Sequence, residues 1–135
     1  MTSVDEASFW SSASLRIMDV PELHSEIIEA LGDGSFHHIA GDTRSENSLR
    51  KWRNSIWSIE APLPETMEIH DHLKWMSDYA LQKESFLLSL KRRGARIDIY
   101  MSYACDDDHR GFGLDPSLLE VFVRLGIRFE MSIIT

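Results

Sequence analysis

Apolar and polar residues alternate along four stretches of the chain, the pattern expected of half-buried β-strands. In the clearest of these, residues 95–103, every odd position from Ile97 to Tyr103 is apolar or aromatic, and the positions between carry polar or charged side chains. The other three stretches are residues 13–17, 56–61 and 127–133, and a fifth, shorter strand is expected at about residues 36–40. Because each strand has one apolar and one polar face, the pattern predicts a mainly antiparallel sheet that is covered on one face only.

Three further stretches repeat their apolar residues every three or four positions, as amphipathic helices do. They cover residues 21–31, 66–93 and 116–125. The first and the third begin with a proline and end before a glycine, Gly32 and Gly126, which suits the first turn and the end of a helix. The apolar stripe of the middle stretch changes phase near residues 80–84, so two helices are expected there rather than one.

The first and last helices belong to two similar units, each made of a strand, a proline-started helix, a Leu-Gly stop and a strand. The likeness is visible in "PELHSEIIEALG" (21–32) and "PSLLEVFVRLG" (116–126), and either an old duplication or shared helix-capping chemistry explains it. Together the elements predict an α+β fold, a ferredoxin-like sandwich with helices on one face of the sheet. Residues 12–135 are expected to form this single domain behind a loose leader of residues 1–11. The side chains expected to lie deepest in the core are Ile27, Leu73, Ile99, Phe122 and Phe129.

The same stretches carry a resemblance. "LRIMDVPELHSEIIEALG", "SIWSIEA" and "GFGLDPSLLEVFVRLGI" resemble a family of small bacterial domains that has only a domain-of-unknown-function label. The likeness covers most of residues 12–134, and its motifs are helix starts, helix stops and a strand with a tryptophan. It implies the fold and no activity. In that family the loop before the tryptophan strand is basic and contains glycine, which residues 40–54 match loosely.

Composition and charge narrow the range of partners. The chain has 135 residues, of which 43% are hydrophobic, so one globular domain with a single core is expected. Its formal net charge is −8. Nucleic acid binding normally requires a basic surface, so a nucleic acid partner is not expected and a basic protein partner suits the charge better. The densest basic cluster, Lys91–Arg93 with Arg96, is interpreted as the end of a helix running into a strand.

Cysteine content and hydropathy indicate the compartment. Cys105 is the only cysteine, so no disulfide forms within the chain. The first residues lack the basic and then apolar pattern of a secretory signal, and no apolar run approaches the roughly 20 residues that span a bilayer. A cytoplasmic protein without a membrane association is therefore expected.

The stretch "DDDHRGFG", which begins with Asp106, Asp107, Asp108 and His109, raises the question of a metal site. A calcium loop of the EF-hand type spaces its oxygen ligands and lies between two helices, whereas these acids are consecutive and follow a predicted strand. Consecutive side chains in extended backbone point apart and do not converge on one ion. A solvated hairpin turn is the preferred interpretation, and no metal is expected to bind.

The remaining candidates for chemistry have the wrong spacing. His70 and His72 lie about 200° apart on a helix, so they cannot chelate one ion together. His37 and His38 point to opposite faces of an extended strand. A site assembled from distant histidines, such as His38, His72 and His109, stays open. The chain has no nucleophile-elbow, phosphate-loop or dinucleotide motif, and the acids beside Cys105 disfavour its thiolate, so no catalytic residue and no cofactor are assigned.

Trp52 lies in the long loop that precedes the tryptophan strand. After the short strand predicted at about residues 36–40, it is the one aromatic residue of this loop. It is flanked by Arg50, Lys51 and Arg53. Exposed aromatic residues among basic side chains are typical interface anchors, and some stack on nucleic acid bases. The alternative is that Trp52 folds back over the core, and the sequence does not decide between them.

The preferred function is a non-catalytic cytoplasmic domain that acts through a protein–protein contact. An acidic surface, a small size and the absence of catalytic motifs are also typical of bacterial immunity proteins, which neutralise toxins. The expected interface combines the acidic hairpin of residues 103–110, which contains Asp106, Asp107, Asp108 and His109, with nearby exposed polar faces of the strands. Trp52 with its basic neighbours is the competing position, and it would indicate an acidic or nucleic acid partner instead. The alternative function is a small-molecule or metal-dependent enzyme with its site between the sheet and the 35–54 loop.

Overall fold

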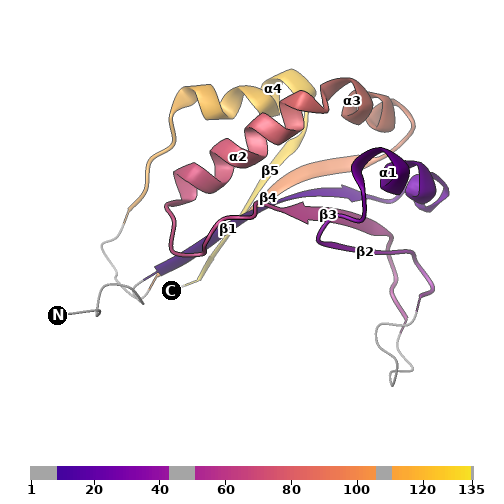
Figure 1. Cartoon of the computed structure of the whole chain (residues 1–135), viewed down its shortest axis with the longest axis horizontal. Helices are drawn as coiled ribbons and strands as arrows, with labels where there is room; N and C mark the ends of the chain where they lie inside the picture. Colours follow the sequence, from indigo (N-terminus) through magenta and orange to yellow (C-terminus); the bar gives the residue numbers. More distant parts are fainter. Residues whose placement is uncertain (1–8, 43–50, 106–110, 135) are drawn as a thin grey trace.

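A five-stranded sheet forms the base of the molecule (Figure 1). The computed structural model describes residues 9–42, 51–105 and 111–134. Across the sheet the strands follow the order β2-β3-β1-β4-β5, and every neighbouring pair is antiparallel except β4 and β5, which are parallel. The strands are β1 (Phe9–Met18), β2 (Phe36–His38), β3 (Ile56–Glu60), β4 (Arg96–Cys105) and β5 (Arg128–Ile134). The predicted α+β fold with a mainly antiparallel sheet is confirmed.

The helices lie on one face of this sheet and leave the other face uncovered by helix (Figure 1). They are α1 (His24–Leu31), α2 (Ile69–Gln82), α3 (Glu84–Arg92) and α4 (Glu120–Leu125). The predicted break in the middle helical stretch is confirmed, because α2 and α3 are separated at Lys83. The two prolines start short 3₁₀ turns, η2 (Pro21–Leu23) and η3 (Pro116–Leu119), and the α-helices begin only after them.

The two strand-helix-strand units join the sheet in different ways. In the second unit α4 connects β4 to β5, and these two strands are parallel neighbours. In the first unit α1 leads from β1 to β2 at the far edge, and β3 lies between them. Gly126 ends α4 with φ 64° and ψ 37°, a left-handed conformation that glycine adopts without strain. The likeness between the units therefore lies in the helix and its ends.

The core lies between the sheet and α2. Leu15 and Ile99 face each other across β1 and β4, and both are fully buried, as is Leu73 on α2. Ile27 on α1 is 1% exposed. These three predicted core positions, Ile27, Leu73 and Ile99, are confirmed.

The predictions for Phe122 and Phe129 are wrong, because both side chains lie where the core ends. Phe122 is only partly buried, and Phe129 is 38% exposed. The two rings pack edge to face with centroids 5.1 Å apart. β5 is the last strand of the sheet and α4 has only six residues, so little of the helix layer extends over the far side of Phe129.

The central strands are longer than their alternation indicates. β1 and β4 pair along ten residues, from Phe9 opposite Cys105 to Met18 opposite Arg96. Residues 9–11 are therefore strand, which corrects the predicted leader of residues 1–11. A ten-residue register fixes each polar side chain of β1 opposite one of β4, and this positions the site described below.

The link between α1 and β2 is fixed by a buried tryptophan. Trp57 on β3 is fully buried, and its indole N–H donates to the carbonyl oxygen of Gly32 at 2.9 Å. Gly34 has φ 65°, and a Cβ atom there would lie 2.5 Å from the carbonyl oxygen of Ser58. Only glycine fits this position, because any side chain would clash with β3. The tryptophan of the predicted strand thus has a packing role.

None of the helices in the described part of the chain combines the length and the apolar character that crossing a bilayer requires.

Candidate functional site

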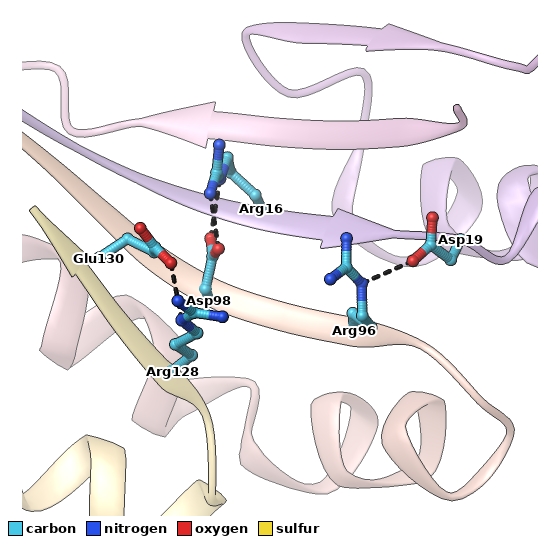
Figure 2. A network of polar contacts seen from close by, with 6 residues as sticks. All are labelled: Arg16, Asp19, Arg96, Asp98, Arg128 and Glu130. Carbon is cyan, nitrogen blue, oxygen red and sulfur yellow. Dashed lines mark hydrogen bonds and ion pairs between the residues drawn. The ribbon is translucent and has the colours of Figure 1, made fainter. Parts of the chain in front are cut away.

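The uncovered face of the sheet carries a row of charged side chains. Arg16 on β1 and Asp98 on β4 face each other in the antiparallel register. Nε of Arg16 donates to one carboxylate oxygen of Asp98 at 2.8 Å and Nη2 to the other at 2.6 Å (Figure 2). The Asp98 side chain is 7% exposed and that of Arg16 is 27% exposed. A bidentate pair of this kind combines charge with fixed geometry, so the guanidinium is held in one orientation.

The surroundings of Arg16 hold it charged. Its hydrogen bonds to Asp98 raise the pKa of the guanidinium above the ordinary value, and partial burial opposes this. The guanidinium carbon also lies 4.4 Å from the centre of the Tyr100 ring, within the range of a cation–π contact. Arg16 uses Nε and Nη2 on Asp98, and no acceptor among the described residues engages its second terminal amine, Nη1.

Two further arginines of this face are held in a similar way (Figure 2). Nε of Arg96 lies 2.6 Å from a carboxylate oxygen of Asp19, and Nε of Arg128 lies 2.6 Å from one of Glu130. Each carboxylate orients its guanidinium through Nε. Within the described residues no acceptor engages the terminal amines of Arg96 or Arg128. Those amines can therefore bind an incoming carboxylate as a planar fork.

A cleft of about 840 Å³ opens between this face and the segment of residues 51–55. A second hollow of about 570 Å³ adjoins it toward β5, and both share Arg16, Met18 and Arg96. The cleft is lined by Arg16, Met18, Asp19, His38, Lys51, Trp52, Arg53, Asn54, Ser55, Ile56 and Arg96. Four of these side chains are cationic and one is a carboxylate.

The wall of the cleft is attached to the sheet by backbone pairing and by aromatic stacking. Trp52 N–H donates to the carbonyl oxygen of Asp42, and Gly41 N–H donates to that of Trp52, both at 2.9 Å. The indole lies parallel to the His38 ring, 3.7 Å between centroids, and meets Phe36 edge on at 5.7 Å. Trp52 is half-buried. It therefore packs on side chains of β2 and lines the cleft at the same time. Its role as an interface anchor stays a prediction.

The cleft has more positive than negative charge. Asp98 and Asp19 balance Arg16 and Arg96, whereas Lys51 and Arg53 have no carboxylate within ion-pair distance among the described residues. Each of these two charges lies beside Trp52 in the sequence. A chain of net charge −8 thus presents a locally cationic, partly aromatic cleft. Such a surface attracts carboxylate or phosphate groups.

A family model for a domain of unknown function, DUF4279, matches residues 11–135. The chain belongs to this family. The predicted resemblance to a family of small domains of unknown function is thereby confirmed. Searches of curated proteins and of solved structures find no match to the chain.

The predicted interface of this DUF4279 domain falls outside the described residues. Asp106, Asp107, Asp108 and His109 belong to residues 106–110, which the structure does not describe. The metal question raised by "DDDHRGFG" lies there as well. Trp52 is the only one of the five predicted site residues that the structure describes, and it lines the cleft.

The described histidines of the DUF4279 domain are divided between the two faces of the sheet. His38 stacks on Trp52 at the open face, whereas His37 turns to the helix side and shares a hydrogen bond of 3.1 Å with His24. His72 is buried in α2, where its Nε2 lies 3.1 Å from the carbonyl oxygen of Pro64. His38 and His72 therefore do not converge, which corrects the open suggestion of a site formed by these two with His109. In the described residues no three histidine, cysteine or acidic side chains come close enough to hold a metal ion.

Sequence analysis missed the arginine row. Arg16, Arg96 and Asp98 were visible as polar positions of two alternating strands, but alternation does not say which strands are neighbours. The basic cluster lies at the end of a helix that runs into a strand, as predicted, because α3 ends at Arg92 and β4 begins at Arg96. Lys91 donates to the carbonyl oxygens of Leu125 and Gly126, where α4 ends. Its neighbour Arg96 belongs instead to the cleft.

Proposed function

We propose that this protein is a non-catalytic binding domain that makes a protein–protein contact through the open face of its sheet. In this proposal the partner places an acidic, extended segment in the cleft beside Trp52. The observation that carries the proposal is the excess positive charge of the cleft in an otherwise acidic protein. Lys51 and Arg53 supply the excess, and the terminal amines of Arg16 and Arg96 supply oriented donors.

The shape of the surface favours an extended segment. The cleft and its neighbouring hollow run from β2 toward β5, across the strands. Five strands about 4.8 Å apart give a path of roughly 19 Å, the length of about six residues of extended chain. Trp52 stands at one end of this path and Arg128 near the other. Half-buried tryptophan and arginine are the residues that most often anchor such contacts.

The carboxylates of this face favour binding over proton transfer. Asp19 and Asp98 each form an ion pair with an arginine, and Asp98 is almost fully buried. A general acid or base has to reach the reacting group of a substrate, and each of these carboxylates already accepts hydrogen bonds from an arginine. The alternative of an enzyme with its site between the sheet and the 35–54 loop has the same location but less support from these side chains.

A titration with model peptides tests the proposal. The full chain, labelled with ¹⁵N, is titrated with a six-residue peptide rich in glutamate and with the matching lysine peptide. We expect the indole N–H of Trp52 and the Nε–H signals of Arg16 and Arg53 to shift with the glutamate peptide only. Shifts confined to the helix layer, or equal shifts with the lysine peptide, would contradict the proposal.

A charge-matched pair of variants sharpens that test. Lys51→Gln with Arg53→Gln removes the two unbalanced charges of the cleft, and we expect affinity for the glutamate peptide to fall about tenfold or more, which is about 1.4 kcal/mol. Lys74→Gln with Arg92→Gln changes the net charge equally on the helix layer. If both pairs weaken binding equally, the effect is one of net charge and the cleft is not the site.

The toxin-neutralising role is a separate candidate, in which the partner is a basic bacterial toxin and not an acidic segment. It rests on the acidity of the chain and places the contact at Asp106, Asp107, Asp108 and His109. A basic partner steered by those acids would associate more slowly with a variant in which all three aspartates are asparagine, whereas Trp52→Ala would leave that rate unchanged. The opposite result favours the cleft.

A further inference from the structure

The two edges of the sheet differ in how open they are to another strand. β2, at one edge, has only three residues, and short edge strands pair poorly. β5, at the other edge, has seven residues, and none of them is proline, glycine or lysine. In the described part of the chain β5 pairs only with β4, so its outer backbone groups form an unpaired row. Two usual protections of an edge strand, proline and lysine, are therefore missing from β5, and its two charged side chains are Arg128 and Glu130.

The side chains along this edge are apolar and exposed. Phe129 is 38% exposed, Ile133 61% and Ile134 52%. In the segment that leads from β4 to β5, Val123 of α4 is 86% exposed and Leu119 of η3 is 39% exposed. Leu119 and Val123 are four residues apart, so they lie on one side of the helical segment. Exposed apolar residues gathered on one element of a small domain indicate an interaction surface.

We propose that β5 pairs in antiparallel fashion with β5 of a second copy of this chain, which makes one continuous sheet of ten strands. A two-fold axis through Met131 gives the register. In this register Phe129 of each copy lies opposite Ile133 of the other copy. Two apolar pairs therefore cover the helix side of the interface between the two strands. The whole length of the strand is used, because Arg128 then lies opposite Ile134.

Charge and the length of the overlap together select this register from its neighbours: an axis at Ser132, for example, would pair only residues 130–134. With the axis at Met131, Glu130 lies opposite Ser132 of the second copy. With the axis at Glu130 the two Glu130 carboxylates would face each other, and like charges directly opposite in a sheet are destabilising. With the axis at Phe129 only a few residues of each β5 would pair. The pairing centred on Met131 therefore combines the longest overlap with no like-charge contact.

A second copy fits this edge better than an unrelated charged partner. The two charges of β5, Arg128 and Glu130, already form an ion pair with each other at 2.6 Å, so the strand offers no net charge to a charged segment. Its apolar pairs match only in the self-complementary register. Each copy has a net charge of −8, so the copies repel one another at long range and the dimer should tighten as salt rises. This inference does not depend on the proposed function.

Sedimentation equilibrium of the full chain, from roughly 1 µM to 300 µM, tests the proposal. We expect a monomer–dimer equilibrium that Ile133→Lys shifts to monomer at every concentration, while the circular-dichroism spectrum stays that of the wild type. The thermal midpoint of this variant should match that of the wild type at the lowest concentration, where the wild type is monomeric. Phe36→Lys on the opposite edge strand is the matched control and should leave the dimer intact. A wild-type chain that stays monomeric throughout, or a dimer that is lost with Phe36→Lys and kept with Ile133→Lys, overturns the proposal.

Disulfide trapping then tests the register. In a Cys105→Ser background, single cysteines replace Glu130, Met131 and Ser132 in turn. Met131→Cys should form a covalent dimer fastest, because only that residue lies opposite itself, and the other two lie about 7–8 Å from their copies on the diagonal. Faster trapping through Glu130→Cys or Ser132→Cys would show a different register and contradict the one proposed.

Discussion

Replacing Asp98 by asparagine removes the negative charge beneath Arg16 and keeps the size of the side chain. Two charge-assisted hydrogen bonds, at 2.8 Å and 2.6 Å, lose their ionic partner. Removing one member of a fully buried ion pair costs about 3–5 kcal/mol, because the other charge is left without compensation. The Arg16 side chain is 27% exposed and regains some hydration. We therefore expect Asp98→Asn to lower the free energy of unfolding by about 2–3 kcal/mol.

Urea unfolding followed by far-UV circular dichroism measures this loss. Asp19→Asn is the matched control, because it breaks the Arg96 pair, whose side chains are 68% and 40% exposed. Exposed pairs contribute at most about 1 kcal/mol, so the control should remain close to the wild type. A double-mutant cycle with Arg16→Met isolates the interaction itself, and a coupling of about 1–2 kcal/mol is expected.

Two results would refute this reasoning. If Asp98→Asn costs no more than Asp19→Asn, burial of the carboxylate does not strengthen the pair. If the cycle gives no coupling, the loss arises from repacking around position 98 and the ion pair contributes nothing. Either result would also weaken the proposed site, because the orientation of Arg16 would then lack the support that Asp98 is expected to give.

Two further predictions concern stability. Leu73→Ala should cost about 2–5 kcal/mol in urea unfolding, because the side chain is fully buried, whereas Phe129→Ala should cost about 1–2 kcal/mol because its ring is partly exposed. Burial lowers the pKa of His72, so the folded protein resists protonation there while the unfolded chain takes up the proton near pH 6.5. Stability should therefore fall as the pH is lowered from about 7.5 to about 5.5, and His72→Gln should flatten that dependence; an unchanged dependence would show that other groups cause it.

The fold was predictable because each of its elements is marked locally. Alternation identified the long strands, and the glycines that follow α1 and α4 stand where the sequence placed them. The failures occurred where burial depends on neighbours. Phe129 alternates as a core residue should, yet it lies on the last strand of the described sheet, and its ring stays 38% exposed beside Phe122 of α4. No pattern within residues 127–133 reveals that β5 is an edge.

The site was not predictable for a related reason. Arg16 and Asp98 are 82 positions apart, and they meet only because β1 lies in the middle of the sheet with β4 beside it. Alternation gives each strand a polar face without saying which polar residues become neighbours. Trp52 was recognised from its local context, since a tryptophan between basic residues in a loop is unusual wherever the loop lies. The sequence therefore indicated Trp52 in the wall of the cleft and missed the Arg16–Asp98 pair on the open face of the sheet.

The opposite signs of the whole chain and of the cleft have a kinetic consequence. An acidic partner approaches a protein of net charge −8, so long-range repulsion slows encounter, and salt screens this repulsion beyond about 8–10 Å. Once the acidic segment lies in the cleft, its carboxylates contact Lys51, Arg53 and the free amines of Arg16 at short range. Salt weakens those contacts and hastens dissociation.

Association and dissociation rates of an acidic partner should therefore both rise with salt, whereas a basic partner would associate more slowly as salt rises. Rates measured at two salt concentrations thus identify the sign of the partner's charge, and a falling association rate would place the contact on the acidic surface and not in the cleft.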